Sequence, residues 1–133
     1  MSAKPGQSQS EGELEAASPH LKIYLRVVSA GDVAIGPGKA DLMAAIQAYG
    51  SLSKAGRALG ISYRRVWDMV EAINKGFDKP LVTTSHGGAK GGGARLTETG
   101  EIVLALYRNM QSDVSETAEA HFDEIRKYLK TDT

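Results

Sequence analysis

The chain has 133 residues, of which 41% are hydrophobic and 24% charged, as expected for a single globular domain with one modest core. It has no cysteine, which excludes disulfide bonds and thiolate zinc sites, and its sequence contains no apolar run as long as a membrane span. We therefore expect a cytoplasmic protein with no membrane partner.

The 16 basic and 16 acidic side chains are unevenly distributed along the chain. Residues 1–35 carry 3 basic and 4 acidic groups, residues 36–97 carry 9 and 4, and residues 98–133 carry 4 and 8, so the three net charges are −1, +5 and −4. A basic middle between acidic ends indicates a localised surface for a polyanion, although basic side chains on most surfaces are simply solvated.

The first third of the chain is predicted to hold a disordered tail, two strands and a helix. Residues 1–19 are rich in Ser, Gln, Glu, Ala and Gly, and they cannot bury enough apolar surface to fold. The alternation in LKIYLRVV, residues 21–28, predicts a half-buried strand, and GDVAI, residues 31–35, predicts a turn and a second strand. After the GPG break at residues 36–38, apolar residues at helical spacing predict a helix that ends at Gly50.

The stretch GSLSKAGRALGISYRRVWDMVEAINKG predicts two short helices. Ser51 or Ser53 is expected to cap the first helix, and Ser62 the second, which runs to about Asn74. Gly60 supplies the tight turn between them.

The spacing of Gly56, Gly60 and Val66 is typical of a helix-turn-helix. The small residue lets the two helices approach closely, the second glycine turns the chain, and the β-branched residue packs the second helix on the first. Any pair of helices with a glycine turn can imitate this pattern, so the pattern alone does not distinguish the two.

The second of these helices has an apolar stripe and a polar outer face. The stripe contains Trp67 beside Val66 and Val70, so we expect Trp67 to pack in the core rather than to stack on a base. Arg64 and Arg65 stand in the first turn, where the helix dipole disfavours positive charge. An unfavourable placement of this kind favours a functional role over a merely solvated face.

The glycine-rich stretch PLVTTSHGGAKGGGARLT predicts a β-hairpin, with strands at residues 81–85 and 94–96, directly after that helix. Such a hairpin is a wing, and Lys90 and Arg95 give it positive charge. A nucleotide-binding loop is disfavoured because no G-x-x-x-x-G-K-[ST] motif is present. A linker is disfavoured because strand-like sequence flanks the loop on both sides.

Residues 21–110, and above all ISYRRVWD and GGAKGGGARLT, closely resemble the N-terminal winged-helix domain of ModE-type regulators, which respond to molybdate and are related to the LysR type. The resemblance implies DNA binding by the first turn of the second helix and by the wing at residues 88–95. Full-length family members add molybdate-binding modules after this domain. This chain stops at Thr133 with no room for them, so we expect that it does not bind molybdate alone.

A final helix is predicted from residue 98 to residue 130, with apolar residues at three- and four-residue steps. In the regulators that the chain resembles, the equivalent helix forms the dimer contact, which implies a homodimer here. The alternative is a helix that breaks near residues 113–115 and folds back on the domain. The residues expected at the dimer contact are Val103, Leu106, Met110 and Val114.

The predicted fold is α+β and mainly α, namely a winged helix-turn-helix at residues 20–97 with a dimerisation helix at residues 98–130. The predicted partner is duplex DNA and the predicted role is transcription regulation in a bacterium. We expect no cofactor, no catalytic residue and no metal site, because His20, His86 and His121 are scattered. The residues expected to bind DNA are Ser51, Ser53, Ser62, Tyr63, Arg64, Arg65, Asp68, Lys90 and Arg95.

Two other classes of function remain open at this point. One is a winged-helix module that binds a protein and hardly uses its basic face. The other is an enzyme that holds a nucleotide in the glycine loop, and it would be stabilised by that nucleotide against thermal unfolding.

Overall fold

The computed structural model describes residues 18–85 and 93–130. Most of the predicted disordered tail and the wing loop with Lys90 lie outside these residues. The chain divides into two compact units, one made of residues 24–113 and a smaller one made of the residues before and after them. This division runs through the last helix. None of the helices in the described ranges is long and apolar enough to span a bilayer.

The N-terminal strand pair is shorter than predicted. Strand β1 (Val27–Ser29) pairs antiparallel with β2 (Asp32–Ile35). Ala30 and Gly31 form the turn, with φ angles of 54° and 85°, and two positive φ angles in succession are what a tight two-residue hairpin requires. The predicted start of the first strand at residue 21 is wrong, since residues 18–26 contain no strand.

Residues 21–26 keep the predicted alternation of burial without joining a sheet. Leu21, Ile23 and Leu25 are half-buried, and the residues between them are exposed. Leu25 packs against the core, and its carbonyl accepts a hydrogen bond of 2.7 Å from the Tyr107 hydroxyl. Burial raises the pKa of Tyr107 above its ordinary value of 10.0, which keeps the phenol protonated as a donor.

The three predicted helices of the middle of the chain are present. They are α2 (Pro37–Tyr49), α3 (Leu52–Leu59) and α4 (Tyr63–Lys75). Gly50 ends α2 with a φ of 71°, and Gly60 ends α3 with a φ of 73°. Both angles lie in the left-handed region that favours glycine. The two helices therefore end where a glycine can adopt this conformation without a steric clash.

Serine side chains cap α3 and α4. The Ser51 hydroxyl accepts a hydrogen bond of 3.0 Å from the backbone N–H of Lys54, so Ser51 and not Ser53 is the cap of α3. The Ser62 hydroxyl accepts one of 3.1 Å from the backbone N–H of Arg65. Each cap satisfies a donor that the first turn of a helix leaves free.

The helix-turn-helix spacing produces the close approach that the sequence predicts. A Cβ atom added to Gly56 would lie 2.9 Å from a methyl carbon of Val66 and 3.1 Å from the carbonyl oxygen of Ile61. The backbone N–H of Ile61 donates to the Gly56 carbonyl at 3.0 Å, which closes the turn. The core continues from this contact through α2, α4 and the wing, and its most deeply buried large side chains are Leu42, Met43, Ile46, Ile73, Leu81 and Val66.

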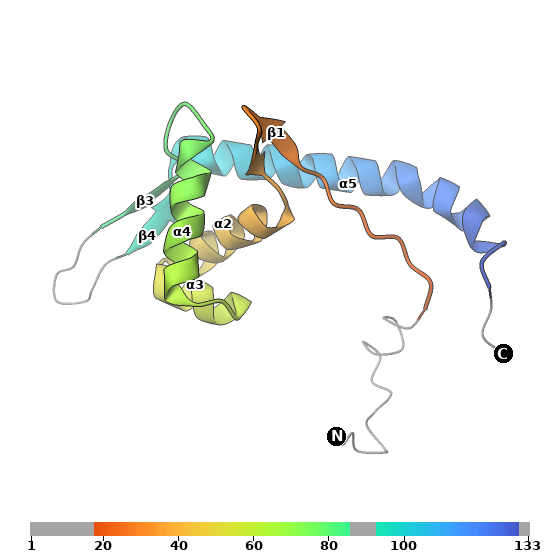
Figure 1. Ribbon diagram of the computed structural model, residues 1–133, viewed down its shortest axis with the longest axis horizontal. Coiled ribbons are helices and arrows are strands. Elements are labelled where there is room, and N and C mark those ends of the chain that lie inside the picture. The colour runs from red at the N-terminus through yellow and green to blue at the C-terminus, as the bar shows by residue number, and fades with distance from the viewer. Residues whose placement is uncertain (1–17, 86–92, 131–133) are drawn as a thin grey trace, which may run out of the picture. The chain divides into compact units, whose positions relative to one another are not determined.

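The wing is the antiparallel pair β3 (Val82–Thr84) and β4 (Ala94–Leu96), which extends beside α4 in Figure 1. The Asn74 side chain at the end of α4 holds it in place. Its carbonyl oxygen accepts from the backbone N–H groups of Leu81 and Val82 at 2.8 and 3.0 Å, and its amide donates to the Val82 carbonyl at 3.0 Å. Helix α4 and the wing are therefore tied together by one shared side chain.

Helix α5 (Glu98–Arg126) runs without the break that was considered at residues 113–115, and it ends four residues before the predicted end. Within the larger unit, Leu104 and Tyr107 are buried, and Arg108 donates to Asp41 of α2 at 3.0 Å. The first part of α5 is therefore a component of the winged-helix core. The predicted fold, a mainly helical α+β winged helix-turn-helix, is confirmed by this arrangement.

Candidate nucleic-acid interface

The first turn of α4 is presented to solvent. Its position is set by the Ser62 cap at the start of the helix and by the burial of Val66 and Val70 on the opposite face. Tyr63 and Arg65 are exposed, and the Arg64 side chain is 88% exposed. The sequence-predicted cluster at the start of α4 is thus assembled on one accessible turn.

Asp68 lies one turn after Arg64, and its carboxylate is 3.9 Å from the Arg64 guanidinium. An exposed ion pair at this distance holds its partners weakly, with a value of at most about 1 kcal/mol. Both groups are consequently free to exchange this contact for one with a ligand.

The serine hydroxyls at the starts of α3 and α4 cap these helices and can still donate a hydrogen bond to a ligand. Ser51 and Ser62 use an oxygen lone pair to accept the capping hydrogen bond. Their O–H groups remain able to donate to an anion, because a hydroxyl is donor and acceptor at once. Ser53 is exposed in the first turn of α3 and has no capping role.

The loop end of the wing strands lies against the turn between α2 and α3. The backbone N–H of Ala94 donates to the Gly50 carbonyl at 3.0 Å. Thr83 and Arg95 are direct cross-strand neighbours, and both are exposed, whereas the next residues on β4 are buried. Arg95 therefore stands on the solvent side of the wing, close to the start of α3.

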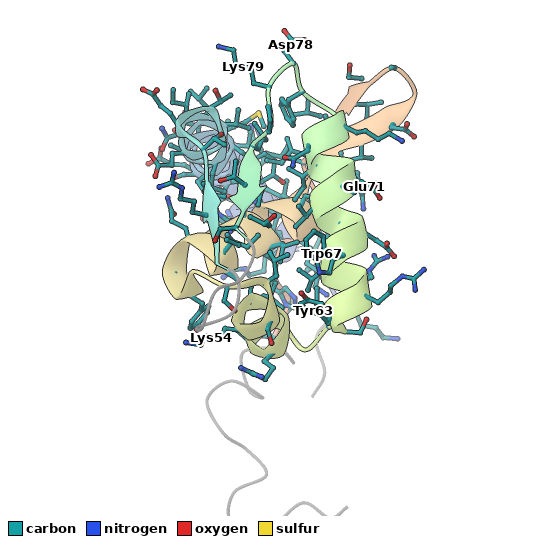
Figure 2. The ribbon with its side chains drawn as sticks, turned by 90° about the vertical axis from the view of Figure 1, so that its left-hand side faces the viewer. Lys54, Tyr63, Trp67, Glu71, Asp78 and Lys79 are labelled. Atoms are coloured by element: carbon teal, nitrogen blue, oxygen red, sulfur yellow. The ribbon has the colours of Figure 1, made fainter. Side chains whose placement is uncertain are left out.

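The structure thus joins the wing strands to the turn before α3 through Ala94 and Gly50, and it joins α3 to α4 through Gly56 and Val66. Of the nine residues expected to bind DNA, eight are described and Lys90 is not. In Figure 2, Tyr63, Trp67 and Glu71 follow one another along α4, and Lys54 on α3 lies toward the Tyr63 end of this row.

The prediction that Trp67 packs in the core is wrong. The side chain is 37% exposed, and its ring meets that of Tyr63 edge to face, with centroids 6.2 Å apart. The apolar stripe of α4 is narrower than the sequence indicates, because Val66, Val70 and Ile73 already cover the helix contact. Trp67 consequently lies at the edge of the stripe and faces outward.

Sequence reasoning also missed Lys54 and Asn74. Lys54 is an exposed cation in the first turn of α3. Its position three residues after the capping Ser51 is the sequence feature that could have indicated it. Asn74 was read only as the end of a helix, and nothing in the local sequence indicates that its amide binds the wing.

The four residues expected at the dimer contact differ in exposure. Leu106 is 63% exposed, whereas Val103 and Met110 are half-buried against the core and Val114 is half-buried. Ile102, which the sequence analysis did not include, is 53% exposed one turn before Leu106. The exposed apolar residues on this side of α5 are therefore Ile102 and Leu106, and only Leu106 belongs to the predicted set.

The described ranges, 18–85 and 93–130, contain no cluster of metal-ligating side chains. No three His, Asp or Glu side chains come together there in a position to hold a metal ion.

Residues 39–101 match the family model described as bacterial regulatory helix-turn-helix protein, lysR family. The chain is 42% identical over 81 residues to the molybdenum-pterin-binding protein MopB of Rhodobacter capsulatus, over 61% of this chain and 30% of that protein. It is 37% identical over 87 residues to the transcriptional regulator ModE of Haemophilus influenzae, over 65% of this chain and 32% of that protein. The chain therefore spans about 30% of the length of these relatives.

Among solved structures, the chain is similar to the full-length LTTR LysG from Corynebacterium glutamicum with bound effector Arg. The TM-score is 0.52 at 26% identity, over 68% of this chain and 29% of that chain. The same protein without the stated effector gives a TM-score of 0.51 at 27% identity.

Proposed function

We propose that this chain, whose residues 39–101 form a helix-turn-helix domain of the lysR family like that of ModE regulators, is a DNA-binding regulator of transcription. The observation that carries the proposal is the exposed first turn of α4, where Tyr63, Arg64 and Arg65 stand free of the core. The family match and the ModE relatives support it. We place the protein in the cytoplasm with the DNA.

The proposed complex places α4 in the major groove. The groove is about 12 Å wide, and a helix with its side chains is about 10–12 Å across, so one helix fits. Arg64 or Arg65 then reaches the O6 and N7 atoms of guanine with two parallel hydrogen bonds, the commonest base-specific contact. Tyr63 and Asp68 are the other two base-contacting residues proposed on this helix. The Asp68 carboxylate is suited to accept a hydrogen bond from the N4 amino group of cytosine.

Phosphate contacts surround this helix in the proposed complex. Ser51 and Ser53 at the start of α3 donate hydroxyl hydrogen bonds, and Ser62 does so at the start of α4. The wing supplies positive charge through Arg95 and, in the part that the structure does not describe, through Lys90. Such contacts position the protein on the duplex and carry little sequence information.

We assign DNA binding to residues 20–97 and dimer formation to residues 98–130. Exposed Leu106 and Ile102 on α5 support a homodimer, because large apolar side chains at helical spacing are covered when two copies pair. Val103, Met110 and Val114 border this pair in the proposed contact. A two-fold symmetric dimer would recognise two related half-sites.

Alanine at Arg64 or at Arg65 tests the proposed function. Loss of a two-pronged contact to guanine is expected to weaken specific DNA binding by about 1–3 kcal/mol and to relax the preference for that base. The measurement is a titration with a duplex that the wild-type protein selects from a random pool, at two salt concentrations.

Lys79→Ala is the matched control, because Lys79 is an exposed cation beyond the other end of α4 (Figure 2). It is expected to leave the preference for guanine unchanged. If wild type fails to bind any duplex in a salt-dependent way, the winged helix is instead a protein-interaction module. If it binds and both alanine variants bind equally well, α4 is not the reading helix.

We further propose that this chain alone does not bind molybdate. An oxyanion site needs several convergent donors in a place that excludes water. The donor-rich positions described here, at the starts of α3 and α4, are open to solvent, where screening gives a small dianion little advantage. Calorimetry of the purified chain with molybdate is expected to show no saturable binding, and one-to-one binding at micromolar affinity would refute the proposal.

A further inference from the structure

The two aromatic rings on α4 form an unusual exposed cluster. Tyr63 is 55% and Trp67 is 37% exposed, and the two rings stand one turn apart in edge-to-face contact. Edge-to-face packing orients one ring against the other, so the pair presents a defined apolar surface to solvent. The neighbouring exposed side chains on this helix, Arg64, Asp68 and Glu71, are all charged.

Trp67 lines the groove between α4 and the first wing strand. This groove has a volume of about 490 Å³, and its walls are Trp67, Glu71, Asn74 and Lys75 on the helix and Val82 and Thr84 on the wing. The hydrogen bonds of Asn74 to the wing fix the spacing of the two walls. An indole is thus held at the edge of a groove of fixed width between α4 and the wing.

The chemistry of the major groove identifies what such a surface can recognise. Each base pair presents hydrogen-bond donors and acceptors there, and the C5 methyl group of thymine is the one apolar group. A desolvated indole gains by covering a methyl group and loses by covering an unpaired polar base edge. An indole that is buried against a base edge in the major groove is therefore expected to favour thymine over the other three bases.

We infer that Trp67 is a specificity-determining residue that packs on a thymine methyl group, with Tyr63 orienting its ring. The inference rests on the proposed function, since it assigns a base to the groove-facing side of the same helix. Tyr63 acts here through Trp67, in addition to any contact of its own with DNA.

The test uses wild-type protein and a duplex that it selects from a random pool. Each thymine of that duplex is replaced in turn by uracil, which removes the C5 methyl group and leaves base pairing intact. We expect replacement at one or two positions in each half-site to weaken binding by about fourfold, the value of one buried methyl group. Trp67 is the one tryptophan of the chain, so its fluorescence should also change when this duplex binds and change less with the uracil duplex.

Trp67→Ala is expected to bind the thymine and the uracil duplexes equally. Tyr24→Ala, at a 60% exposed tyrosine outside α4, is the matched control and should keep the fourfold difference. If Trp67→Ala fails to fold, the uracil scan and the fluorescence of wild type decide the question without it.

Two results would overturn the inference. One is specific binding that no uracil replacement weakens, as expected if the aromatic pair docks a protein instead. The other is a uracil effect that survives in Trp67→Ala. Failure of the proposed function is a separate outcome, because then no duplex is selected from the pool at all.

Discussion

Replacing Leu106 with glutamate is expected to turn the protein into a monomer and to weaken its binding to a two-half-site duplex by about 100-fold or more. Leu106 is 63% exposed and Ile102, four residues earlier on α5, is 53% exposed. A buried and unpaired carboxylate in the centre of a dimer contact costs several kcal/mol, which separates the copies. Each half-site is then bound on its own, and the gain of about 10²–10⁴ that linked binding provides is lost.

Sedimentation checks the assembly and a DNA titration checks the binding. Wild type is expected at about twice the chain mass of 14.2 kDa. Ser112→Glu is the matched control, because it adds the same charge at an exposed position about 120° around the helix axis from Leu106. It should remain dimeric. A wild-type chain that stays monomeric at tens of micromolar would contradict the proposed contact on α5.

Gly100→Ala is expected to destabilise the fold by about 3 kcal/mol or more, at the upper end of overpacking costs. A Cβ atom on Gly100 would overlap the carbonyl oxygen of Leu81 and lie 3.0 Å from its carbonyl carbon. Those atoms are backbone, Leu81 is fully buried, and its carbonyl also accepts from the N–H of Thr97 at 2.9 Å. Neither α5 nor the start of the wing can move aside without breaking these contacts.

Chemical denaturation measures the effect, and Gly38→Ala is the control. Gly38 is helical and exposed, and its added Cβ would meet only a Met69 methyl carbon at 3.9 Å. Alanine there is expected to be neutral or to stabilise the protein by up to about 1 kcal/mol, since it reduces the freedom of the unfolded chain. Equal stability of wild type and Gly100→Ala would show that α5 does not pack on Leu81 as closely as described.

The sequence by itself determined the features that depend on near neighbours along the chain. Glycines with left-handed φ angles end α2 and α3, and serine caps start α3 and α4. The close contact of Gly56 with Val66 follows from a spacing of ten residues across one turn. These choices are local because a cap or a turn is satisfied by atoms a few residues away, so their residue types are visible in a short window.

Only the tertiary structure decided which apolar residues of α4 and α5 are buried and which are exposed. Periodicity indicated Trp67 for the core and did not separate buried Leu104 and Tyr107 from exposed Leu106. It also predicted a sheet strand that begins at residue 21, whereas Leu25 packs against the core and accepts a hydrogen bond from Tyr107, 82 residues away. An apolar period shows that a face must be covered, and which distant element covers it depends on contacts that no short window contains.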